Sequence, residues 1–128
     1  LYIESVPPQA SASASVVELR TEASPNASGV RVSVRRSGEL ELIAFADNAV
    51  GAAAVAKFTP LVALLHVAAG DPGEVEAFVV KDGEWERFAQ ATLSVPTLGK
   101  LRLGITNPAD GVFFLDDIVI ARSMPPVP

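Results

Sequence analysis

The chain has 128 residues, 49% hydrophobic and 20% charged, which is typical of one globular domain and not of a disordered tail. Its net charge of -5 disfavours nucleic acid as a partner, because a nucleic-acid binder must neutralise phosphates. The absence of cysteine excludes disulfides, thiol catalysis and cysteine-ligated zinc or iron–sulfur clusters. No apolar stretch reaches the 18 or so residues of a transmembrane helix, so we expect no membrane span.

The two ends of the sequence predict its organisation. It begins at Leu1 without an initiator methionine, and it ends in a proline-rich run after Met124. We therefore expect part of a longer polypeptide, with a single β-sandwich domain over residues 1–122 and a Pro-rich tail or linker over residues 123–128.

The first half of the chain shows a hydrophobic period of two, which is typical of strands. Residues 15–20 form a first predicted strand. Residues 30–35 alternate valine with polar residues and predict a half-buried strand, which a turn at Ser37-Gly38 joins to a second strand at residues 39–42. The alanine-rich residues 49–57 favour a strand or a loop over a helix, because Gly51 interrupts them and they lack a clear cap.

The second half adds a buried strand and a second hairpin. Residues 61–67 are apolar and predict a central strand, closed by turn-forming residues at 70–73. Residues 74–80 and 84–91 flank Asp82-Gly83, a dipeptide typical of two-residue hairpin turns.

Two further strands complete the prediction. Residues 100–105 alternate again, and residues 112–121 form the most hydrophobic segment of the chain. The total of eight or nine short strands predicts an all-β fold, built as two packed sheets or one closed sheet.

The order of these elements resembles the jelly-roll domains of the concanavalin A-like lectin and glucanase superfamily, especially its laminin G-like members. The resemblance lies in the alternating strand 30–36, the hairpin 74–91, the strand 99–104 and the closing segment 111–120 with its Asp-Asp pair. It implies an antiparallel β-sandwich of jelly-roll type at the cell surface or outside the cell. It also implies a concave sheet face, which binds a glycan in many relatives and a protein in others.

The sequence departs from this family in its length. Relatives begin with another strand or two before the region that matches Leu1. We therefore expect either a trimmed domain or a missing first strand, and a missing strand would leave a sheet edge open to another chain.

Paired carboxylates are the first candidates for chemistry, since glucanases of this superfamily use alternating carboxylates on one strand. Three pairs share a strand face: Glu39 and Glu41, Glu74 and Glu76, Glu84 and Glu86. None shows the family's Glu, Asp, Glu order, so we interpret them as solvated polar faces and expect no enzyme activity.

Acidic residues near the C-terminus suggest a metal site. Asp116 and Asp117 interrupt the most apolar segment, and an unpaired buried charge there would be costly. The one that points inward could accept hydrogen bonds from backbone amides, pair with Lys100 or Arg102, contact a glycan or bind calcium. Asp110 in the preceding turn is a further calcium ligand candidate, since calcium takes several oxygen ligands. Other turn residues that could contribute are Asp71, Asp82 and Asn107.

Trp85 is the main candidate for ligand contact, because sugars stack on exposed aromatic rings; packing across the hairpin is the alternative role. Its neighbours Glu84 and Glu86 and the single histidine, His66, complete the candidate set. His66 alternates with Val62 and Leu64 and is otherwise a half-buried sheet residue with a hydrogen bond. Five phenylalanines are assigned to the core or the inter-sheet space: Phe58, Phe78, Phe88, Phe113 and Phe114.

Two functional hypotheses lead. The first is a non-catalytic β-sandwich module of a larger surface or secreted protein that binds carbohydrate on a concave sheet face. The second is a structural or assembly domain that mediates protein–protein contacts. A glycoside hydrolase or lyase remnant is a third hypothesis that rests on the resemblance alone.

Overall fold

The computed structural model describes residues 1–5, 13–21, 29–45, 48–54, 59–104, 112–115 and 118–127. Within these ranges the regular structure is all β, in antiparallel pairs, as the sequence predicts. The search of this part of the chain for a helix long and apolar enough to cross a membrane finds none.

A five-stranded sheet forms the larger layer of the fold. Its strands, in spatial order, are β5 (Asn48–Ala54), β4 (Glu39–Ala44), β3 (Val30–Arg35), β2 (Ser13–Thr21) and β9 (Leu98–Leu103). The hairpin predicted at Ser37-Gly38 is confirmed, since Val34 pairs with Leu40 and Gly38 has a φ of 85°. Residues 48–54 are a strand, which confirms the preference for strand over helix there.

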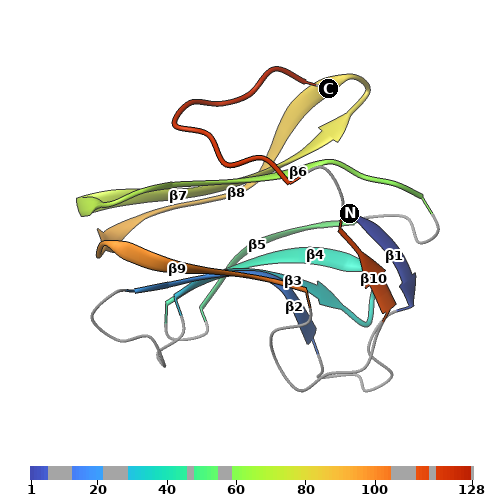
Figure 1. Ribbon diagram of the computed structural model, residues 1–128, viewed down its shortest axis with the longest axis horizontal. Helices are drawn as coiled ribbons and strands as arrows, with labels where there is room; N and C mark the ends of the chain where they lie inside the picture. Colours follow the sequence, from blue (N-terminus) through green and yellow to red (C-terminus); the bar gives the residue numbers. More distant parts are fainter. Residues whose placement is uncertain are drawn as a thin grey trace.

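A three-stranded sheet lies over the larger one (Figure 1). Its order is β6 (Ala63–Ala68), β7 (Gly70–Lys81) and β8 (Glu84–Val95). The predicted turn at Asp82-Gly83 joins β7 to β8, and both residues have positive φ, 52° and 80°. A separate antiparallel pair consists of β1 (Tyr2–Ser5) and β10 (Val112–Phe114).

The hydrophobic core lies between the two main sheets. It gathers buried aliphatic side chains from both layers: Val16, Val30, Val32, Val34, Leu40, Leu42, Val75, Ala77, Val79, Ala89 and Val95. The two sheets lie in close contact where Gly51 of β5 faces β8. A Cβ atom at Gly51 would lie 2.6 Å from the carbonyl oxygen of Phe88 and 2.9 Å from the Cβ of Ala89, so only glycine fits there.

The structure corrects three details of the predicted strands. Residues 61–67 do not form a central strand, because β6 is at the edge of its sheet. The predicted turn at residues 70–73 does reverse the chain, since Ala68 pairs with Glu74, but these residues also pair with β8 and begin β7, with a register irregularity between Gly70 and Gly73. The long last strand is also wrong: β10 ends at Phe114 opposite Tyr2, where β1 begins, so the ladder has no further partner.

The outward face of the five-stranded sheet is less solvated than the alternation in residues 30–35 predicts. Ser33 is fully buried and its hydroxyl lies 3.0 Å from that of Ser15. Glu41 is only 4% exposed and is paired with Arg35. The interpretation of Glu41 as part of a solvated face is therefore wrong, because the ion pair compensates its burial.

One end of the five-stranded sheet carries exposed apolar residues. β9 pairs with β2 on one side only within the described part of the chain, and Leu101 and Leu103 on it are 37% and 41% exposed. β1 pairs with β10 and does not extend this sheet. Among the described residues, an edge of the sheet is thus open at β9.

Candidate functional site

The outer face of the three-stranded sheet carries the densest polar network of the described residues. In β7, Val75, Ala77 and Val79 are buried and point to the core, while the intervening Glu74 and Glu76 point outward. Register places His66 of β6 and Gln90 of β8 directly opposite Glu76. This outward face of β6, β7 and β8 is called the outer face below.

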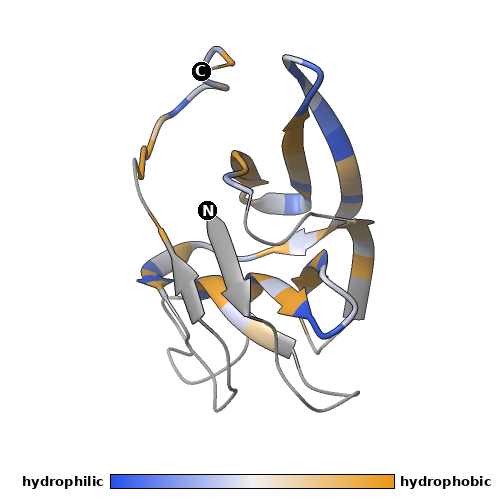
Figure 2. Ribbon diagram, turned by 90° about the vertical axis from the view of Figure 1, so that its right-hand side faces the viewer, coloured by the Kyte–Doolittle hydropathy of each residue, from blue (hydrophilic) through white to orange (hydrophobic). Residues whose placement is uncertain are grey.

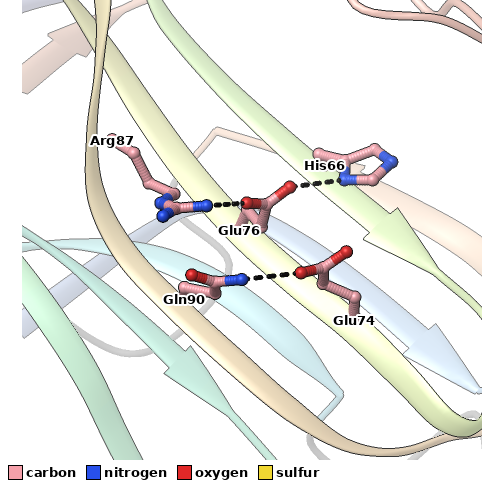
Figure 3. A network of polar contacts seen from close by, with 5 residues as sticks. All are labelled: His66, Glu74, Glu76, Arg87 and Gln90. Carbon is pink, nitrogen blue, oxygen red and sulfur yellow. Dashed lines mark hydrogen bonds and ion pairs between the residues drawn. The ribbon is translucent and has the colours of Figure 1, made fainter.

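Glu76 joins three strands (Figure 3). One of its carboxylate oxygens accepts a hydrogen bond of 2.6 Å from the guanidinium of Arg87, and the other lies 3.1 Å from Nδ1 of His66. The hydrogen bond from Arg87 is the main cause that lowers the pKa of Glu76; partial desolvation opposes it and the contact with His66 adds to it. Glu76 is therefore ionised over the neutral pH range.

The network is accessible to solvent, and its central carboxylate is held by two partners. The side chains of His66 and Arg87 are 49% and 48% exposed, whereas that of Glu76 is 13% exposed. The central carboxylate is thus enclosed by two partners whose outer edges face water. This arrangement fixes polar groups at the surface before any ligand arrives.

A second pair lies beside the first. Gln90 of β8 donates a hydrogen bond of 2.7 Å from its amide to Glu74 (Figure 3). A β-bulge makes this contact possible: Phe78 pairs with Arg87, but Ala77 pairs with Ala89, so Phe88 is the extra residue. If the strand alternated regularly through Phe88, with no bulge, Gln90 would turn toward the core.

The same face becomes more apolar toward the hairpin tip. Phe78 is half-buried, follows Glu76 on the outward side of β7 and lies opposite Arg87 and Leu64. It is not among the residues of the core cluster, so its assignment to the core is wrong, whereas Phe88 does pack against the core. Phe58, Phe113 and Phe114 lie where the structure describes no side chain.

The predicted ligand contacts do not form one site. His66 is a sheet residue with a hydrogen bond, as expected, although it is exposed rather than half-buried. Trp85 lies opposite Val80, four residues along β7 from Glu76, which corresponds to about 13 Å. Glu84 and Glu86 adjoin Trp85 near the hairpin tip and are exposed.

The environment of Trp85 differs from that of an open stacking platform. Its indole Nε1 donates a hydrogen bond of 3.1 Å to the carbonyl of Pro125, and the contact is partly buried. The tail therefore returns to the hairpin over the outer side of the three-stranded sheet (Figure 1). Glu86 pairs with Lys81, with a distance of 3.2 Å between Nζ and the carboxylate.

The predicted calcium ligands cannot be placed. Asp110, Asp116 and Asp117 lie outside the described residues, as does Asn107. Asp71 and Asp82 are exposed at opposite ends of β7 and do not approach each other.

Other residues that could hold a metal do converge. His66, Glu74 and Glu76 each offer a ligand atom within 4.8 Å of the other two. In sequence, Glu74 and Glu76 were recognisable only as a same-face pair, and Arg87 and Gln90 carried no signal. The strand register brings all of them together.

No protein-family model matches the chain, and neither a curated protein nor a solved structure shows significant similarity to it.

Proposed function

We propose that this chain is a non-catalytic β-sandwich module of jelly-roll type that binds carbohydrate through the outer face. The observation that carries the proposal is the network of His66, Glu76, Arg87, Glu74 and Gln90, whose polar groups are accessible and already fixed by one another. A surface or secreted location is part of the proposal through the family resemblance.

The chemistry of these groups suits a sugar. Carboxylate, amide and guanidinium groups provide the acceptors and paired donors that neighbouring hydroxyls require. Phe78, half-buried on the same face opposite Arg87, offers an apolar surface to the C–H face of a sugar ring. We therefore assign the sugar contact to the outer face around Phe78 and not to Trp85, because the Trp85 indole is hydrogen-bonded to the tail.

The state of Glu76 supports binding over glycoside cleavage. A glycosidase needs one carboxyl group whose pKa is raised so that it can donate a proton. The contacts with Arg87 and His66 lower the pKa of Glu76 instead, which makes it a poor general acid.

A thermal-shift screen tests the proposal. The isolated chain is heated with a panel of soluble polysaccharides and oligosaccharides in the presence of EDTA, because a ligand of the folded state raises the melting temperature. We expect a rise with one glycan class that is lost in Arg87→Met and Gln90→Ala.

The control for this screen is Glu84→Gln at the exposed hairpin tip, which should keep the full response. No rise across the panel would contradict the proposal, and so would a rise that survives Arg87→Met and Gln90→Ala.

Exposed apolar side chains favour a second candidate function, assembly with another protein chain. Ile118, Val119 and Ile120 of the tail are 52%, 74% and 81% exposed, and Leu101 and Leu103 are exposed at the open edge of β9. Figure 2 shows the apolar stretch of the tail running outside the two main sheets. Sedimentation equilibrium over a range of concentrations tests this: association that Val119→Ser weakens would support it, and a monomer throughout would refute self-assembly.

A further inference from the structure

We propose that His66, Glu74 and Glu76 form a binding site for a divalent transition metal ion, with zinc the best fit. The three side chains come from two neighbouring strands, and their ligand atoms lie within 4.8 Å of one another. This inference goes beyond carbohydrate binding and does not rest on it, because the metal can be titrated without any glycan.

The donor set selects the class of metal. An imidazole nitrogen with two carboxylates suits zinc and its neighbours in the first transition row, whereas calcium and magnesium prefer oxygen ligands alone. The imidazole also distinguishes this cluster from ordinary surface acidic groups. The proposed zinc site shares no residue with the calcium site that the sequence predicts at Asp110, Asp116 and Asp117.

The geometry needs little adjustment. Zinc bonds of about 2.0–2.1 Å in a tetrahedron place two ligand atoms about 3.3 Å apart. Nδ1 of His66 already lies 3.1 Å from the carboxylate of Glu76. A zinc ion would lie between these two atoms, bound to Nδ1, and the neutral imidazole would carry its proton on Nε2.

The third strand holds the carboxylates in place. Arg87 donates to Oε1 of Glu76 and Gln90 donates to Oε1 of Glu74, so one oxygen of each carboxylate is engaged by β8 (Figure 3). Such contacts orient metal-ligating groups and usually change metal affinity by about 10- to 100-fold. Water would fill the remaining coordination positions, since His66 is half exposed.

Isothermal titration of the untagged chain with zinc chloride tests this site. We expect saturable binding of one ion. His66→Ala and Glu76→Gln should each weaken binding about tenfold or more, and Gln90→Ala should weaken it without any change of charge. Calcium chloride should not compete.

The matched controls are Glu84→Gln and Glu86→Gln, which make the same change of charge at the hairpin tip and should alter affinity by less than about twofold. The absence of saturable zinc binding would overturn the proposal, and so would equal weakening by the controls.

A spectroscopic readout does not depend on the variants folding. The chain has one histidine, so its imidazole gives a single set of NMR signals. Zinc should shift or broaden these signals in the wild-type chain as the ion binds. Signals that stay unchanged at saturating zinc would place the ion elsewhere and refute the site. The glycan screen is run in EDTA and the zinc titration without a glycan. A negative result in one experiment therefore does not affect the other proposal.

Discussion

The substitution Gly51→Ala tests the packing of the two sheets and the bulge behind the outer face. Two opposing effects act on the free energy of unfolding. Alanine restricts the unfolded chain, which by itself stabilises a protein by about 0.4–1 kcal/mol when the native backbone accepts it. The new methyl group would meet the Phe88 carbonyl at 2.6 Å and Ala89 at 2.9 Å.

We expect the steric clash in the folded state to outweigh the entropic stabilisation. The groups in contact are a backbone carbonyl and a buried Cβ, neither of which can swing away as the end of a long side chain would. Overpacking of this kind costs about 1–3 kcal/mol, so we expect a net destabilisation of about 1–2 kcal/mol after the entropic gain is subtracted.

Urea denaturation followed by far-UV circular dichroism measures this effect. With a slope of about 1–3 kcal/mol per molar urea, the midpoint should fall by roughly 0.5–1 M. Gly99→Ala in the exposed part of β9 is the matched control and should not lower the midpoint. A Gly51→Ala midpoint equal to or above that of the wild type would refute the close approach of β5 to β8.

Three further predictions concern single side chains. Because the pKa of Glu76 is lowered from 4.5, its charge stabilises the fold above that pH and the contribution is lost as pH falls through the lowered value. The destabilisation by Glu76→Gln should therefore be largest near neutral pH and shrink in acid, as urea titrations across pH would show; a pH-independent difference would contradict this. Arg35→Met should destabilise the chain by about 1–2 kcal/mol more than Arg36→Met, because Arg35 is the one of the two that pairs with the buried carboxylate of Glu41; equal urea midpoints would refute this. Removal of residues 123–128 should shift the fluorescence of Trp85 to longer wavelength, and unchanged emission would show that the tail does not cover the indole.

The hairpins were predictable because their signals are local. Ser37-Gly38 and Asp82-Gly83 sit between alternating segments, and a short turn of two or three residues fixes the first cross-strand pairs on either side of it. Near the tip, the pairing of Lys81 with Glu84 and of Val80 with Trp85 follows from the turn alone.

The site was harder to predict because it depends on contacts that are distant in sequence. The bulge at Phe88 shifts the register by one residue and turns Gln90 to the outer face, and no local signal marks it. The contact between His66 and Glu76 likewise requires the register of β6 on β7. The composition singles out His66 as the one histidine, but its contact with Glu76 follows only from the strand register.

The strand predicted over residues 112–121 was too long, because the prediction relied on residue type alone. Its β-branched residues around Ile120 predict a buried strand, yet they are exposed because the short β1 offers no further pairing beyond Phe114. Propensity alone does not provide a partner strand.

The proposal that the outer face is the ligand-binding surface is tested most directly by NMR of the side chains of His66, Arg87 and Trp85. The glycan that raises the melting temperature is titrated in EDTA while the His66 imidazole, the Arg87 guanidinium and the Trp85 indole signals are followed. We predict that the signals of His66 and Arg87 move with binding and that the Trp85 indole stays in place. Movement of Trp85 without His66 and Arg87 would contradict the claim and move the binding surface to the hairpin tip.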